Sequence, residues 1–169
     1  MTSPLHAVSM SVINSSQAIH LHESLPGGLA DLPDLIGEVV VPFEVCQELA
    51  AGVAKDTAWQ ALQLRAGFRL QKAPVQIHPL LQVQIDAGEA AVIQTALDHG
   101  HRAVILDDLK ARRLAKVLGL EVTGTLGVLI MAKKAGMLPS IRAAITDLQQ
   151  RGMWVSPALV AQAIALGGE

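Results

Sequence analysis

Four acidic side chains stand next to apolar runs, where several carboxylates could meet and act together. Asp107 and Asp108 directly follow the apolar stretch AVIL, Glu48 lies inside the helical pattern FEVCQELAAG, and Glu89 follows Gly88 at the start of another helical pattern. If these carboxylates converge, their mutual repulsion requires a cation, and an all-oxygen set of ligands suits Mg²⁺ or Mn²⁺ better than Zn²⁺. Such a metal site serves phosphoryl chemistry, because it activates a water molecule and neutralises charge on a phosphodiester.

The same acids also have an ordinary structural explanation. Asp107 can cap the helix expected over LKARRLAKVLG, with Asp108 in its first turn at the positive end of the helix dipole. Glu48 and Glu89, taken one at a time, fit solvated helix positions. The residue types alone leave the two interpretations open.

The helix expected over LKARRLAKVLG carries an ordered row of basic residues. Lys110, Arg113 and Lys116 recur at helical spacing on one face, opposite a stripe of alanine and leucine. Such a face is either solvated or lies along a phosphate backbone.

Charge is distributed unevenly along the chain. Residues 1–100 hold four Lys/Arg against ten Asp/Glu, whereas residues 101–169 hold nine against five. This asymmetry is typical of a polyanion partner beside an acidic site, although charges distant in sequence also mix on a folded surface. Two Phe and two Trp are too few for a module that grips single strands by stacking bases, so any nucleic acid would be held mainly by its backbone.

Two further motifs are weaker signals. Thr125 lies in GTLG, where backbone N–H groups at a helix start can receive a phosphate, with close packing and N-capping as the alternative. His20 and His22 form HLH, but they point apart if the segment is helical. The chain has no cysteine pair and no HExxH, so zinc is not expected.

An alternation of short apolar runs and helical patterns must position these residues. Strands are expected at HAVSMSVIN, GEVVVP, RAVIL and LEVTG, and the residues near 24–38 and 66–80 fit irregular connections. Helices are expected at QAIHLHESL, FEVCQELAAG, KDTAWQALQLRAG, DAGEAAVIQTALDHG, LKARRLAKVLG, TLGVLIMAKKAG, PSIRAAITDLQQRG and SPALVAQAIALGG. This order predicts an α/β domain with a parallel sheet covered on both faces.

The expected strand ends place three polar residues where ligands bind. In open parallel sheets, ligands lie beyond the carboxyl ends of the strands, and Asn14, Asp107 and Asp108 follow such ends directly. Ser15 or Ser16 is the expected N-cap of the helix that follows Asn14.

Length and composition indicate one domain over residues 1–169. Apolar residues make up 51% of the chain and charged residues 17%, which predicts a well-filled core. No run approaches the about 18 apolar residues needed to span a bilayer, and the first residues do not resemble a secretion signal. A cytoplasmic protein with no membrane partner is therefore expected. Cys46, the single cysteine, fits a core position.

The chain resembles PIN domains, small metal-dependent nucleases, and among them a group described as nucleic-acid-binding proteins with a PIN-like fold. The likeness spans nearly the whole sequence and is carried by SVINSS with QAIHL, by VVVPFEVCQELAAG, by DAGEAAVIQTAL, and above all by VILDDLKARRLAKVLGLEVTGTLGVLIMAKKAGML. The resemblance implies a three-layer α/β/α fold around a mostly parallel sheet of four to five strands. It also implies one or two Mg²⁺ or Mn²⁺ ions held by four acidic positions, and hydrolysis of RNA phosphodiester bonds.

Position by position, the resemblance makes Glu48 the second acid, Glu89 the third, and Asp107 with Asp108 the fourth. The first acid should be an aspartate in a pattern like DSS, but Asn14 stands there, a neutral and weaker ligand for a hard cation.

The remaining expectations concern nucleic acid and partners. Ser15, Ser16 and Thr125 are expected to contact the nucleic acid, with the basic row of Lys110, Arg113 and Lys116 along its backbone. The resemblance implies single-stranded RNA as substrate, a homodimer, and a place as the toxin of a toxin/antitoxin pair with an antitoxin-like partner. Asn14 leaves two alternatives: a catalytically silent PIN-like module that binds nucleic acid or a protein, or a structural module without metal. We expect the active nuclease, because only one of the acidic positions is changed.

Overall fold

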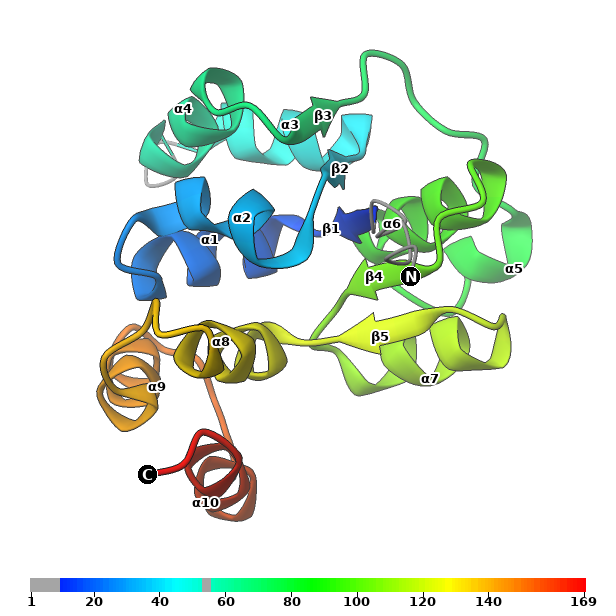
Figure 1. Cartoon of the computed structure of the whole chain (residues 1–169). Helices are drawn as coiled ribbons and strands as arrows, with labels where there is room; N and C mark the ends of the chain where they lie inside the picture. Colours follow the sequence, from blue (N-terminus) through cyan, green and yellow to red (C-terminus); the bar gives the residue numbers. More distant parts are fainter. Residues whose placement is uncertain (1–9, 53–55) are drawn as a thin grey trace, which may run out of the picture.

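The computed structural model of the chain describes residues 10–52 and 56–169 (Figure 1). Within these residues five short strands form one parallel sheet in the order β3-β2-β1-β4-β5. The strands are β1 (Ser11–Ile13), β2 (Val39–Val41), β3 (Phe68–Leu70), β4 (Ala103–Ile105) and β5 (Glu121–Thr123). The predicted three-layer α/β/α architecture is confirmed.

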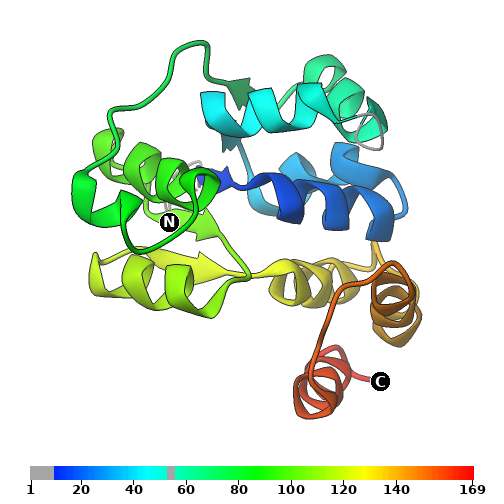
Figure 2. The same cartoon turned by 180° about the vertical axis from the view of Figure 1, so that it is seen from behind.

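Helices cover both faces of the sheet. Seen from behind, α3, α6 and α7 lie in front of the strands (Figure 2), and α2 lies on the opposite side (Figure 1). The helical elements are α1 (Ser15–Ser24), the 3-10 helix η1 (Gly28–Asp31), α2 (Leu32–Ile36), α3 (Phe43–Ala51), α4 (Asp56–Leu64), α5 (Pro79–Gln82), α6 (Ala87–Asp98), α7 (Leu109–Val117), α8 (Thr125–Lys134), α9 (Ile141–Gln150) and α10 (Pro157–Leu166).

The apolar runs form strands whose residues are buried in the core. All three residues of β1 and of β2 are buried, as a parallel strand covered on both faces requires. Helix α6 is buried over most of its surface, including Ala90, Val92 and Ile93, because it lies across β1 and β4. Cys46 is buried at 7% exposure, and burial raises the pKa of its thiol to about 11, so this cysteine fills the core as expected.

Several predicted boundaries need correction. The strand expected over residues 6–14 is described at Ser11–Ile13, and residues 6–9 lie outside the described part of the chain. The connections expected near 24–38 and 66–80 contain η1, α2 and the edge strand β3. In strand β3 the exposed Arg69 separates the partly buried Phe68 and Leu70, so the strand carries no apolar run that the sequence could reveal.

The last three helices form a layer at one end of the molecule. Helix α9 packs on α1 and α8, and α10 packs on α8 and α9 (Figure 1). None of the described helices combines the length and the apolar character that a bilayer crossing requires.

Candidate active site

Strands β1 and β4 are neighbours at the point where the strand order reverses. From β1 the chain moves outward through β2 and β3, then returns to β4 and β5 on the other side. Ile13 of β1 pairs with Ile105 of β4, so Asn14 and the pair Asp107 and Asp108 emerge at the same edge of the sheet. A reversal of this kind opens a crevice beyond the carboxyl ends of two adjacent strands, which is where open α/β sheets bind ligands.

Asn14 and Ser15 begin the first helix and fix a carboxylate from α3. Asn14, not Ser15 or Ser16 as predicted, is the N-cap of α1: its Oδ1 accepts a hydrogen bond from the backbone N–H of Ser15 at 2.8 Å. The hydroxyl of Ser15 is therefore free to donate to Glu48 Oε2, at 2.5 Å. This bond holds Glu48 beside Asn14.

Gly88 lets the first turn of α6 approach these two oxygen-bearing side chains. A Cβ on Gly88 would lie 2.8 Å from Asn14 Oδ1 and 3.1 Å from Glu48 Oε1, closer than a side chain normally comes. The oxygen atoms of Asn14 and Glu48 thus border a space that any residue other than glycine would fill.

Glu89 and Asp108 complete the acidic surroundings of the same helix start. The pKa of Glu89 is raised, first by burial and then by the negative charges of Asp108 and Asp86. Asp108 is exposed and caps α7, with Oδ1 accepting from the backbone N–H of Ala111 at 2.9 Å. At the N-terminus of α6, Glu89 is therefore in electrostatic conflict with Asp108, and Asn14 and Glu48 lie against Gly88 in the same turn.

Asp107 is used differently from its neighbour. Its Oδ1 accepts from the backbone N–H of Thr125 at 2.7 Å, and its Oδ2 accepts from the Thr125 hydroxyl at 2.6 Å and from Gln17 Nε2 at 3.2 Å. Burial raises the pKa of this carboxyl, but the nearby His20 imidazole and the donors on Thr125 and Gln17 outweigh burial, and the pKa lies below its ordinary value. Asp107 thus ties α1 and α8 to the end of β4.

This arrangement decides between the interpretations of GTLG. Thr125 is fully buried, and both its N–H and its hydroxyl are bound to Asp107, so it has no donor left for a phosphate. The carboxylate of Asp107 occupies the helix start that a phosphate would otherwise use. Gly124 permits this contact, because a Cβ there would lie 2.6 Å from Asp107 Oδ1.

Comparison with known protein families agrees with the fold. Residues 10–169 match a family model described as PIN domain. The chain belongs to the PIN-domain family. No curated protein and no solved structure matches it. PIN domains have a nuclease-type fold and typically use divalent metal ions, and this family membership implies binding of nucleic acid.

The candidate ligand atoms of this PIN domain are of the chemical type that such an ion binds. Asn14, Glu48, Glu89 and Asp108 offer oxygen atoms alone, as Mg²⁺ and Mn²⁺ prefer, and the space bordered by Asn14 and Glu48 over Gly88 is kept open by a glycine. Across residues 10–52 and 56–169, no three His, Cys, Asp or Glu side chains already stand close enough to hold a metal ion together. An ion would therefore have to draw Glu89 and Asp108 toward the Asn14 and Glu48 oxygens.

The other predicted site residues of the PIN domain lie at the surface. Ser16 is exposed at the start of α1, and Lys110, Arg113 and Lys116 are exposed on α7. Arg112 points inward instead, with Nη1 donating to the backbone oxygen of Leu106 at 2.8 Å.

The histidines of α1 diverge as expected for a helix. His20 Nδ1 lies 4.0 Å from Asp107 Oδ2, whereas His22 Nδ1 accepts from the backbone N–H of Leu29 at 3.3 Å. The contacts that Gln17 and Gly88 make were not predicted from the sequence. A polar residue at position 17, on the face of α1 that also buries Ala18 and Leu21, was the available signal for Gln17.

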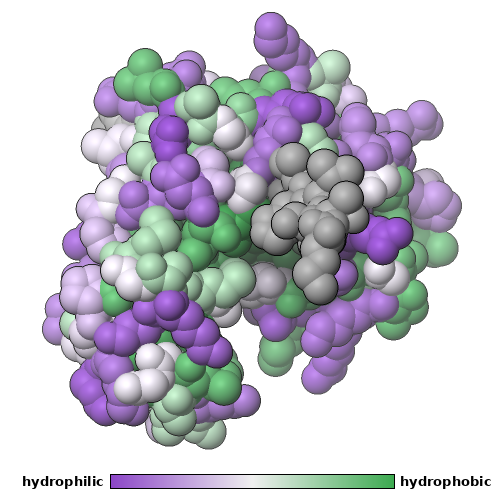
Figure 3. Space-filling model, viewed as in Figure 1, coloured by the Kyte–Doolittle hydropathy of each residue, from purple (hydrophilic) through white to green (hydrophobic). Residues whose placement is uncertain are grey.

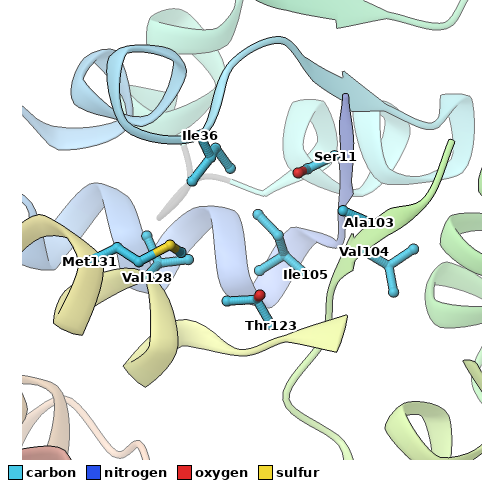
Figure 4. A pocket seen from close by; sticks show the side chains of 8 residues that line it. All are labelled: Ser11, Ile36, Ala103, Val104, Ile105, Thr123, Val128 and Met131. Atoms are coloured by element: carbon cyan, nitrogen blue, oxygen red, sulfur yellow. The ribbon is translucent and has the colours of Figure 1, made fainter. Parts of the chain in front are cut away.

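A small cavity elsewhere in the PIN domain is unrelated to this chemistry. It has a volume of about 20 Å³, room for about one water molecule. Its lining contains no acidic residue: Ser11, Ile36, Ala103, Val104, Ile105, Thr123, Val128 and Met131 surround it (Figure 4).

Proposed function

We propose that this PIN domain is a metal-dependent endoribonuclease that hydrolyses phosphodiester bonds of single-stranded RNA. One observation carries the proposal: at the reversal point of the sheet, the α6 N-terminus lies against the oxygens of Asn14 and Glu48 at Gly88, and its Glu89 feels the charge of Asp108. Burial and the charges of Asp108 and Asp86 raise the pKa of Glu89, so its charged form is disfavoured, and a bound cation would offset that effect.

Asn14, Glu48, Glu89 and Asp108 would hold Mg²⁺ or Mn²⁺. When bound there, the ion would activate a water molecule for attack on phosphorus and neutralise charge on the phosphate. Ser15 keeps Glu48 in place through its hydroxyl. Asp108 suits the ligand role better than Asp107, because both carboxylate oxygens of Asp107 already accept hydrogen bonds from Thr125 and Gln17.

The substrate backbone would lie along the exposed basic residues of α7. Lys110, Arg113 and Lys116 are not engaged in any ion pair with the described residues, so they remain available to phosphates. Contacts of this kind depend on salt, because they release counterions from the nucleic acid. The scarcity of aromatic side chains supports backbone contact over base stacking.

Cleavage of a labelled single-stranded RNA of mixed sequence tests the proposal. The natural protein is expected to cut with Mn²⁺ and to stop with EDTA, and Asp108→Asn is expected to remove the activity. Glu121→Gln, at the far, amino end of β5, is the matched control that removes one exposed acid and should retain cleavage. Cutting that persists in EDTA, or in Asp108→Asn, contradicts the proposal.

Asn14 supports a second candidate function, a silenced PIN domain that binds RNA or a protein without cutting. The Asn14 oxygen already accepts a hydrogen bond from Ser15, and an amide attracts a cation less than a carboxylate does. If Asn14→Asp cuts RNA and the natural protein only binds it, this second function holds.

The exposed surface of the last helix, α10, suits a protein partner. Leu159 and Leu166 of α10 are 47% and 50% exposed, and hydrophobic residues reach the surface where α10 lies, at the lower left of Figure 3. Helix α10 contains no charged residue. An uncharged, partly apolar surface supports contact with protein rather than with RNA, either a second copy in a homodimer or an antitoxin-like inhibitor in the cytoplasm.

A further inference from the structure

Gln17 is a buried amide whose bonding pattern points toward the exposed Ser16. Only 4% of Gln17 is exposed, and its Nε2 donates two hydrogen bonds, to Asp107 Oδ2 at 3.2 Å and to Ser16 Oγ at 3.1 Å. Its Oε1 is buried without a partner among the described residues. A buried acceptor left unpaired costs stability, so the fold gains from this side chain through its two donors alone.

The orientation of the Gln17 amide follows from its neighbours. Turning the amide over would bring Oε1 against the carboxylate of Asp107, placing two acceptors face to face. Asp107 is itself held by both donors of Thr125. The Nε2 group is therefore anchored on one side by a fixed carboxylate and presents its second N–H to Ser16.

A hydroxyl that accepts from an amide has its own proton left to donate. Ser16 Oγ accepts from Gln17, and no described residue accepts the proton of Ser16. Ser15 differs, because its proton is already given to Glu48. Ser16 is exposed in the first turn of α1, a helix with no acidic residue in that turn, so its proton faces a region that favours anions.

We propose that Gln17 is a positioning residue of the RNA site: it holds the Ser16 hydroxyl so that Ser16 donates its proton to a phosphate oxygen of the RNA backbone. The chain Asp107–Gln17–Ser16 thereby links the end of β4 to the substrate. This inference rests on the proposed function, and it adds a residue that touches neither the reacting phosphate nor the metal.

A double-mutant cycle tests the inference through RNA affinity. Binding of a fluorescent single-stranded RNA is measured by anisotropy in EDTA, so that affinity is read without cleavage, for the natural protein, Ser16→Ala, Gln17→Leu and the double variant. Loss of one hydrogen bond to a charged phosphate should weaken binding about tenfold in Ser16→Ala. Gln17→Leu should show nearly the same loss, and the double variant should bind no more weakly than Ser16→Ala.

Controls separate positioning from general stability. Gln63→Leu removes an exposed amide on α4 and should bind RNA as the natural protein does. Thermal unfolding of Gln17→Leu shows whether this variant is folded. If it is not, Ser16→Ala provides the test, because its position is exposed. A folded Ser16→Ala that binds RNA with natural affinity overturns the inference.

The possible outcomes distinguish this inference from the proposed function. Independent, multiplying losses at positions 16 and 17, or natural affinity in a folded Gln17→Leu, overturn the inference while metal-dependent cleavage by the natural protein still stands. A natural protein that neither binds nor cuts RNA overturns both.

Discussion

Asp107 and Thr125 are joined by two hydrogen bonds, from the backbone N–H at 2.7 Å and from the hydroxyl at 2.6 Å. The adjacent Asp108 makes one bond, to the first turn of its own helix. Two neighbouring aspartates thus differ in their contacts: Asp107 fastens α8 to the sheet, whereas no described residue donates a hydrogen bond to Oδ2 of Asp108.

The two aspartates should therefore respond differently to the same substitution. Asp107→Asn places an amide N–H₂ or a neutral oxygen against the two Thr125 donors and should lower the free energy of unfolding by about 2 kcal/mol. Asp108→Asn keeps a good N-cap and should change stability by less than about 0.5 kcal/mol, while lowering cleavage by about 100-fold or more. Urea unfolding and RNA cleavage, measured on both variants, check this division. Equal loss of stability in the two variants would refute it.

Asn14→Asp should strengthen metal binding. The added charge faces Glu48 across the space over Gly88, and the attraction of one more carboxylate should raise Mn²⁺ affinity about tenfold or more. Aspartate caps helices as well as asparagine does, so α1 should remain intact. Titration calorimetry with Mn²⁺ measures the change. Gln162→Glu adds the same charge on exposed α10 and should leave the affinity unchanged.

His22 should make the protein less stable in mild acid. Burial lowers the pKa of His22 below its ordinary value of 6.5, with Glu23 acting in the opposite direction, and the neutral ring accepts a hydrogen bond from Leu29. The unfolded chain therefore protonates His22 more readily than the folded chain does. The contribution of His22 to the free energy of unfolding is complete above pH 6.5 and falls as the pH drops below it.

The variant His22→Asn tests this dependence, because an amide oxygen can accept from Leu29 but does not titrate. Urea unfolding of both proteins at pH 7.5 and pH 5.5, values about one unit either side of the histidine pKa, should show a smaller loss in the variant. An identical loss in the two proteins would exclude His22 as the cause.

Glu169 should stabilise the last helices until the pH is very low. The pKa of Glu169 is lowered from 4.5 to about 2. The largest cause is the hydrogen bond from the backbone of Ile141, which is opposed by burial and reinforced by Lys133, Ser140 and Arg142. A lowered carboxyl pKa gives stability that is complete above pH 4.5 and is lost as the pH falls toward 2. Glu169→Gln should therefore lower the melting temperature at neutral pH, and the difference should shrink in acid. A difference that does not change with pH would contradict this assignment.

The sequence predicted the parts of the fold that local patterns specify. Apolar patterns such as VVV of β2 and the long helical pattern of α6 can be recognised in the sequence, because buried strands and buried helices require apolar residues at most positions. Strand β3 was missed because FRL has an exposed charged residue at its centre and lies at an edge. Asn14, Ser15 and Ser16 are all good N-caps, so the choice among them depends on the exact start of the helix.

The candidate site depends on contacts that are distant in sequence. Gln17 and Asp107 are 90 residues apart, and Ser15 and Glu48 are 33 apart. Only the strand order brings them together. The separation of Asp107 from Asp108 likewise follows from a contact between the end of β4 and the start of α8, 18 residues further along the chain. The family resemblance predicted which positions form the site, and the structure shows the contacts of Asn14, Ser15, Glu48, Asp107 and Asp108.

The most direct test of the central claim is cleavage of single-stranded RNA with Mn²⁺ by the natural protein beside Gly88→Ala. The added methyl group would enter the space between Asn14 and Glu48 and displace their oxygens, while alanine otherwise favours a helix. The account predicts Mn²⁺-dependent cleavage by the natural protein and its loss in a folded Gly88→Ala. Undiminished cleavage by Gly88→Ala, or cleavage that needs no metal, would contradict the account.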